Sequence, residues 1–248
     1  MITLYRPSGY DSPRASSFAG RSVDDKPLDA ENGSSFKEID TRRVFRYDKE
    51  NNLWIEQKST TGGAGATEPY IEETYDADGN LIGAKMYGYT KVRDYAFGNC
   101  TNLALTSLPA GVTSIGIEAF INCTNLALTS LPEGLTSIGD GAFTGCSNLA
   151  LTSLPAGVTS IGIEAFAGCS NLALTSLPAG VTSIGNSAFY GCTSLTSITF
   201  KGTPNAIAAN AFNGCTNLTD IKVPWAEGAV ANAPWGATNA TITYNYTE

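Results

Sequence analysis

Six cysteines are the residues of this sequence whose type and spacing best fit chemistry, because thiolates bind metals, form disulfides and act as nucleophiles. They recur at intervals of 23 residues: Cys100, Cys123, Cys146, Cys169, Cys192 and Cys215. This set predicts either a framework of disulfides or zinc sites, or a row of buried, reduced thiols that pack as small hydrophobic groups. The sequence has no histidine and no Cys-x-x-Cys pair, which disfavours zinc. Every cysteine also holds the same place beside a phenylalanine and a leucine, so we favour the buried row.

The missing histidine also removes the commonest general base and every histidine-based triad. The sequence contains no phosphate-binding G-x-x-x-x-G-K-[ST] loop, and no paired carboxylates stand out on the repeats. We therefore expect no enzymatic activity, no catalytic residue, no cofactor and no metal site.

One short segment matches a calcium loop in part. Asp76, Asp78 and Asn80 alternate as calcium ligands do, but the twelfth position of such a loop needs a glutamate and is Tyr87 here. An Asp-Gly pair between two β-type runs is instead typical of a hairpin turn. We interpret residues 70–91 as a hairpin that caps the first repeat.

The cysteines belong to a repeated unit that predicts the fold. A phenylalanine precedes each cysteine by three residues and a leucine follows it by three. Self-similarity at a period of 23 predicts a mainly β solenoid, in which each unit buries its apolar face against its neighbours. Each unit is expected to hold a short strand, as at residues 103–105, and a turn of helix at Glu118, Ala119 and Phe120. The solenoid is expected over residues 92–224, and residues 225–248 are expected to close it with Trp225, Trp235 and a strand at residues 240–244.

The first 69 residues predict a different kind of structure. Residues 1–20 are expected to form an extended arm, residues 33–58 a small three-stranded β-meander, and residues 59–69 a flexible linker. A meander of this size makes a weak core, so residues 1–58 are expected to be an anchoring module that packs on another chain. The candidate anchoring residues are its aromatic side chains: Phe36, Phe45, Tyr47 and Trp54.

Differences between repeats mark the candidate ligand surface. They fall on the pair of residues before Ala-Phe, such as Ile117-Glu118 and Ile163-Glu164, and on the residue after the phenylalanine. We expect these positions to be free of packing demands and to point outward, although they also fit drift at unconstrained positions. The candidate ligand-binding residues are Ile121, Thr144, Tyr190 and Asn213.

Charge limits the classes of partner. The net charge of −8 argues against nucleic acid and against an anionic membrane surface. The sequence has no long apolar run and begins without a basic segment followed by an apolar one. We expect no membrane insertion and no Sec-type leader.

The unit L-x-S-L-P-x-G-V-T-S-I-G-x-x-A-F-x-x-C-x-x-L closely resembles the BspA-like (Treponema-type) leucine-rich repeat, over residues 92–224. This resemblance implies a right-handed solenoid with one short strand per repeat. It also implies binding to host proteins or surfaces rather than catalysis. Proteins of this type are typically exported, and the missing leader departs from that pattern.

A second resemblance concerns the two ends of the chain. The segments GSSFKEIDT, VFRYD and LW within residues 33–54 look like a short β-module of bacteriophage structural proteins. Residues 223–242 are similar to the closing segment of repeat proteins from gut bacteria and their phages.

Together these features predict a non-enzymatic phage fibre or decoration protein in the virion. Residues 1–58 would hold it to other virion proteins, and the solenoid would bind a host-surface protein or glycan. It would assemble as a homo-oligomer such as a trimer. The alternative is a bacterial cell-surface adhesin of the BspA-like type.

Overall fold

The computed structural model describes five strands within residues 1–69 and the continuous chain over residues 70–247. The chain forms two compact units, residues 1–89 and residues 90–248. The predicted linker over residues 59–69 lies outside the described residues.

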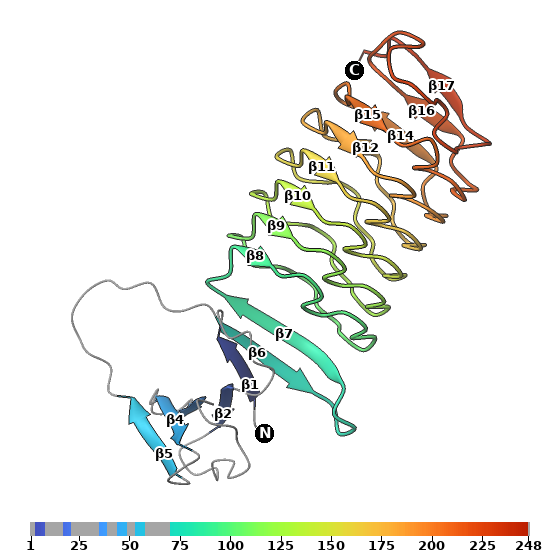
Figure 1. Ribbon diagram of the computed structural model, residues 1–248. Coiled ribbons are helices and arrows are strands. Elements are labelled where there is room, and N and C mark those ends of the chain that lie inside the picture. The colour runs from blue at the N-terminus through green and yellow to red at the C-terminus, as the bar shows by residue number, and fades with distance from the viewer. Residues whose placement is uncertain are drawn as a thin grey trace. The chain divides into compact units, whose positions relative to one another are not determined.

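The first unit is a seven-stranded sheet in the order β5-β4-β3-β2-β1-β6-β7 (Figure 1). Its strands are β1 (Thr3–Pro7), β2 (Ser17–Gly20), β3 (Ser35–Glu38), β4 (Val44–Asp48), β5 (Leu53–Gln57), β6 (Tyr70–Tyr75) and β7 (Leu81–Tyr87). The meander predicted over residues 33–58 is confirmed, because β3, β4 and β5 pair antiparallel in sequence order. In this register Phe36 is opposite Phe45, and Tyr47 is opposite Trp54.

The hairpin of β6 and β7 is confirmed, together with its Asp-Gly turn. The Asp76 carboxylate accepts the backbone N–H groups of Asp78 at 3.0 Å and Asn80 at 2.8 Å. Gly79 closes the turn with φ of 81°. The carboxylate that began the calcium-like pattern therefore holds the turn itself.

The N-terminal residues differ from the predicted arm, because they form β1 and β2. β1 pairs antiparallel with β6, so the hairpin shares a sheet with the N-terminal strands and the unit boundary follows Tyr89. Thr3, Leu4 and Tyr5 favour strands, and their pairing satisfies backbone groups along one side of β6. Capping of the solenoid by the hairpin stays a prediction.

The second unit is the predicted solenoid of stacked 23-residue coils (Figure 1). One parallel sheet contains β8 (Lys91–Val92), β9 (Ser114–Ile115), β10 (Ser137–Ile138), β11 (Ser160–Ile161), β13 (Ser183–Ile184) and β15 (Ala206–Ile207). The other contains β12 (Ser176–Leu177), β14 (Ser197–Phe200), β16 (Asp220–Lys222) and β17 (Thr241–Thr243). In the first sheet each residue pairs with its equivalent one repeat away, as Ile138 does with Ile161.

The strand of the early coils is at the Ser-Ile pair and not at residues 103–105, where the expectation was wrong. Leu103 and Leu105 are nevertheless buried, as the pattern predicted. Burial of alternate leucines therefore occurs here without the hydrogen-bonded ladder that defines a strand.

The turn of helix expected before each phenylalanine is absent, and the described residues contain no helix. Glu118 and Asn122 have φ of 49° and 58°, and left-handed residues interrupt a right-handed helix. The backbone N–H groups of this segment instead donate to carbonyls of the next coil. That of Phe120 donates to the Ala142 carbonyl at 2.8 Å, and that of Asn122 donates to the Thr144 carbonyl at 2.7 Å. The phenylalanine segment is thus a series of turns bonded to the next coil.

The core of the solenoid is a column of six phenylalanine rings, one from each coil. Neighbouring rings are stacked, with centroids 5.0 to 5.5 Å apart and planes within 10° of parallel. The predicted closing residues Trp225 and Trp235 are buried and contact Phe200 with centroids at 5.3 and 5.9 Å. The predicted closing strand is confirmed as β17, which pairs parallel with β16.

The terminal coil continues the repeat with smaller residues. Asn239 donates its side-chain amide to the Thr216 carbonyl at 3.0 Å, as Asn217 does to Thr193 at 2.8 Å. The N–H of Ala240 donates to the Ala237 carbonyl, as the N–H of Leu218 donates to the Cys215 carbonyl one coil earlier. Alanine therefore takes the places of the cysteine and the leucine in this coil.

Close stacking at the glycine after each Ser-Ile pair leads to a first prediction. A Cβ added to Gly162 would lie 2.6 Å from backbone atoms of Gly139 and Asp140 in the preceding coil. We expect Gly162→Ala to lower the free energy of unfolding by roughly 1–3 kcal/mol, because the coils must separate to admit the methyl group. Urea unfolding followed by circular dichroism measures this change.

Gly134→Ala is the matched control, since an added Cβ there has no neighbour nearer than 3.9 Å. We expect this variant to match or slightly exceed the stability of the parent. The equivalent position two coils later is Ala208, which already carries a methyl group. The test therefore uses Gly162, which lies in a coil in the middle of the solenoid. Equal stability of the Gly162 and Gly134 variants would contradict the close-stacking argument.

Candidate binding edge of the solenoid

Five of the six cysteines are buried in the core, as predicted, and Cys100 in the first coil is partly exposed. Each thiol from the second coil onward donates to the phenylalanine carbonyl of the preceding coil, for example Cys123 to Phe97 at 2.9 Å and Cys192 to Phe166 at 3.1 Å. Burial raises the pKa of the Cys169 thiol to about 12. The structure shows no disulfide between the cysteines, and the five that are buried are poor nucleophiles and poor metal ligands as neutral thiols.

Metal binding finds no other support in the described part of the chain. No group of three or more acidic or cysteine side chains is placed there to hold an ion. The same residues include no helix long and apolar enough to cross a bilayer.

The surface of the coils is mostly neutral, with charge gathered on one edge. No lysine or arginine occurs between Arg93 and Lys201, whereas that stretch holds five acidic residues. Four of them occupy the pair of positions before Ala-Phe: Asp94, Glu118, Asp140 and Glu164. We call these paired positions, with the position after each phenylalanine, the variable edge.

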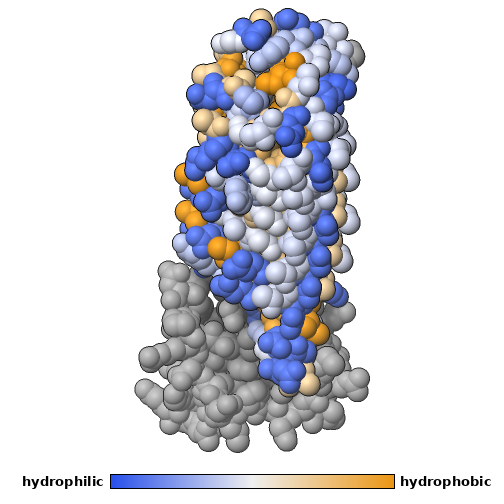
Figure 2. Space-filling view, turned by 90° about the vertical axis from the view of Figure 1, so that its right-hand side faces the viewer, coloured by the Kyte–Doolittle hydropathy of each residue, from blue (hydrophilic) through white to orange (hydrophobic). Residues whose placement is uncertain are grey.

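Exposed hydrophobic side chains lie on the same edge. Ile117 is 41% exposed, Ile163 is 48% exposed, and Tyr190 is 50% exposed. Figure 2 shows one face of the solenoid, on which hydrophobic side chains form separate spots along a margin while most of the face is neutral or hydrophilic. The variable edge thus combines apolar and acidic side chains, whereas most of the remaining surface is neutral and polar.

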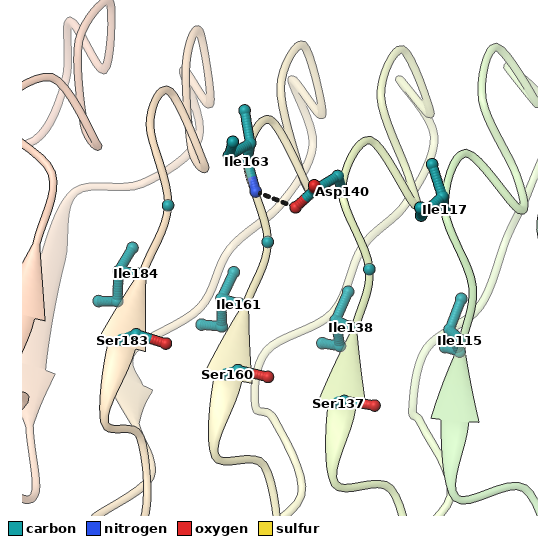
Figure 3. Close-up of a pocket in the computed structure, with 13 residues that line it drawn as sticks. Ile115, Ile117, Ser137, Ile138, Asp140, Ser160, Ile161, Ile163, Ser183 and Ile184 are labelled. Atoms are coloured by element: carbon teal, nitrogen blue, oxygen red, sulfur yellow. Dashed lines mark hydrogen bonds between the residues drawn. The ribbon is translucent and has the colours of Figure 1, made fainter.

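Two aspartates position the two isoleucines. The N–H of Ile117 donates to Asp94 Oδ1 at 2.7 Å, and the N–H of Ile163 donates to Asp140 Oδ1 at 2.7 Å. In Figure 3 Ile117 and Ile163 project past the strands, with Asp140 on the coil between them. An aspartate coil therefore alternates with an isoleucine coil.

The variable edge is more constrained than the sequence suggested. The second residue of the pair is left-handed, with φ of 49° at Glu118, 62° at Gly141 and 53° at Glu164. Non-glycine residues occupy this region rarely. The backbone conformation therefore limits which residues fit the second position of each pair. Neither ligand binding nor drift at these positions is tested by it.

The predicted ligand-binding residues meet only in part. Thr144 and Tyr190 line one groove of about 440 Å³ together with Glu164 and Ser187. The Thr144 hydroxyl donates to the Glu164 carbonyl at 2.7 Å, so it supports the groove wall. The structure does not place the other two predicted residues in this groove: Ile121, which is half-buried, and Asn213, which is exposed.

A second groove of about 420 Å³ runs along the solenoid sheet that contains β9, β10, β11 and β13. It is lined by serine side chains of β10, β11 and β13, with Ile117 and Ile163 beside them (Figure 3). Consecutive residues Ile163 and Glu164 each line one of the two grooves. The differences between repeats include the pairs Ile117-Glu118 and Ile163-Glu164, but these residues were not among the four chosen as ligand-binding. A longer period singles them out, because residues 103–120 and 149–166 are identical and 46 positions apart.

Comparison with known proteins identifies the repeat. The family model described as "BspA type Leucine rich repeat region" matches residues 90–219 in six copies. A search of curated proteins gives no match to the chain.

Three solved structures are similar to the chain. The Leucine Rich Repeat protein of T. pallidum has 29% identity and a TM-score of 0.48, covering 62% of this chain and 81% of that one. A leucine-rich repeat protein from Bacteroides ovatus has 28% identity and a TM-score of 0.50, covering 61% of this chain and 45% of that one. A leucine rich cell surface protein from Faecalibacterium prausnitzii has 27% identity and a TM-score of 0.43, covering 80% of this chain and 55% of that one. The chain spans about half the length of the last two proteins.

Proposed function

The chain belongs to the BspA-type leucine-rich repeat family, and from this premise we propose that it is a non-enzymatic binding protein of the cell-surface type. The observation that carries the proposal is the variable edge, where Ile117, Ile163 and Tyr190 are exposed beside acidic side chains. These side chains are separate from one another, and their recurrence along one edge makes them candidate contact points for a partner. The stacked phenylalanine column holds this edge in a fixed geometry.

The family match supports the adhesin better than the phage fibre or decoration protein. The likeness of residues 33–54 to a phage module has no counterpart in the matches described above, and a virion location draws no support from them. The anchoring role of residues 1–58, with Phe36, Phe45, Tyr47 and Trp54, applies in either setting. Assembly as a trimer and contact with a host protein or glycan are parts of the same proposal.

A binding assay tests the role of the edge. We expect the labelled full chain to bind saturably to at least one of three surfaces: cultured epithelial cells, immobilised extracellular-matrix proteins or a glycan array. The double variant Ile163→Ser/Tyr190→Ser is expected to bind about tenfold more weakly, because it loses the apolar contacts at the edge.

Ala156→Ser is the control, since Ala156 is exposed away from the variable edge. It is expected to bind as the parent does. Equal binding by the edge variant and the control, or no saturable binding to any of the three surfaces, would count against the proposal. Antiserum that labels purified phage particles and leaves intact bacteria unlabelled would restore the virion alternative.

A further inference from the structure

The arrangement of apolar and acidic groups on the variable edge fits one class of partner. We propose that the edge binds a cationic amphipathic α-helix that lies along the solenoid axis. Aliphatic side chains seven residues apart on that helix contact Ile117 and Ile163, and lysine or arginine side chains beside them pair with Glu118 and Glu164. This inference rests on the proposed binding function and narrows the chemistry of the partner.

Residues 94–200 contain no lysine or arginine. Glu164 is exposed and Glu118 half-exposed, and neither has a salt-bridge partner among the described residues. Asp94 and Asp140 add negative potential on the same edge, although one oxygen of each accepts a backbone N–H. Charges of a single sign steer and select a partner of the opposite sign.

Two isoleucine side chains on the variable edge lie outside the buried core of the solenoid. Ile117 and Ile163 project from the sheet margin and are close to half exposed. Covering them with aliphatic groups removes apolar surface from water without moving the backbone. Tyr190 shares a groove with Glu164, and an aromatic face beside a carboxylate suits a lysine or arginine side chain.

The step between coils fits a helix better than an extended peptide. Phenylalanine centroids of successive coils are 5.4 Å apart, and paired strands lie about 4.8 Å apart, so we expect edge residues two coils apart to be separated by about 10–11 Å. Seven residues of an α-helix rise about 10.5 Å and return to nearly the same face. Same-face residues of an extended strand recur at about 6.6–6.8 Å, which matches neither one coil nor two.

Two amidated 21-residue peptides of identical composition test this match. Both are alanine-rich helices that carry two leucines, each with lysines three and four residues away. In the first peptide the leucines are seven residues apart. In the second they are five residues apart and so point to different sides of the helix.

Isothermal titration calorimetry with the full chain gives the two affinities. We expect the first peptide to bind at least tenfold more tightly than the second. Ile117→Ser/Ile163→Ser is expected to abolish that difference. Glu118→Gln/Glu164→Gln should weaken binding of the first peptide and flatten its salt dependence, whereas Glu133→Gln, which removes an acid outside the variable edge, should leave both unchanged.

Equal affinities for the two peptides, or a preference that survives the isoleucine substitutions, would overturn the helix proposal. Edge-dependent binding to cells, matrix proteins or glycans would then still stand, and the proposed function would survive without this partner. Circular dichroism of each variant confirms that the solenoid is folded.

Discussion

Replacing Phe143 by alanine is expected to lower the free energy of unfolding by about 3–5 kcal/mol, the usual range for a buried phenylalanine truncated to alanine. Its ring is fully buried and stacks on Phe120 and Phe166, with both centroids at 5.4 Å. The substitution leaves a cavity inside the column and removes two ring contacts at once. Urea unfolding, followed by circular dichroism, measures the effect.

Two further variants separate the causes of this loss. Phe143→Leu keeps much of the apolar volume and should recover most of the stability, leaving a deficit for the lost ring stacking. Tyr190→Ala removes an exposed ring and is expected to change stability by less than about 0.5 kcal/mol. A Phe143→Ala variant as stable as Tyr190→Ala would refute the column as the main source of stability.

Alkaline pH is expected to unfold the protein through its cysteine row. Desolvation by burial raises the pKa of Cys123 and Cys169 to about 12 and that of Cys215 to about 11, from a value of 9.0 for the free thiol. The folded state therefore retains protons that the unfolded state releases above pH 9. Stability from these groups is complete below about pH 9 and is lost as pH rises toward 12.

The size of this effect follows from proton linkage. Each thiol that stays protonated only in the folded state reduces the free energy of unfolding by about 1.4 kcal/mol per pH unit. Several such thiols act together in this core. We expect urea midpoints measured between pH 8 and pH 11 to fall steeply once pH exceeds 9.

Cys169→Ala isolates the contribution of one thiol. Above pH 9 its free energy of unfolding should fall less steeply than that of the parent. The two slopes should differ by about 1.4 kcal/mol per pH unit, the value for one proton. The two proteins differ at this one residue, so the comparison isolates its thiol. Parallel pH profiles for the two proteins would show that the buried thiols do not control alkaline stability.

The sequence predicted the interior of the solenoid because the same residue types recur where a coil needs them. Phe120, Cys123 and Leu126 are fully buried, as their repetition required. The closing role of Trp225 and Trp235 followed from their size at the point where the repeat ends. Such features depend on composition and period, which one sequence contains.

Features that depend on backbone conformation or on distant pairing were not predictable in the same way. The turn of helix failed because Glu118 adopts a left-handed conformation that its residue type gives no reason to expect. Asn122 and its glycine equivalents, such as Gly145, are the local signal that left-handed residues occur here. The pairing of β1 with β6 joins residues more than 60 positions apart, and no local pattern identifies such a partner.

Ligand binding at the variable edge stays a prediction. Differences between repeats pointed to the variable edge, and Tyr190 is exposed there. Ile117 and Ile163 were counted among these differences but were not chosen as ligand-binding residues. Comparison across two repeats distinguishes them, since only alternate coils carry the Ile-Glu pair.

The alternation of aspartate and isoleucine coils sets the step by which this protein can change length. Loss of residues 103–125 would keep the core in register, because Leu126 replaces Leu103, but it would place Asp140 after Asp94. Loss of residues 103–148 would place Ile163 after Asp94. Asp94 would then again accept the backbone N–H of an isoleucine, as it does from Ile117. Tandem duplication or deletion in multiples of 46 residues therefore lengthens or shortens the binding edge without redesign, while steps of 23 preserve only the scaffold.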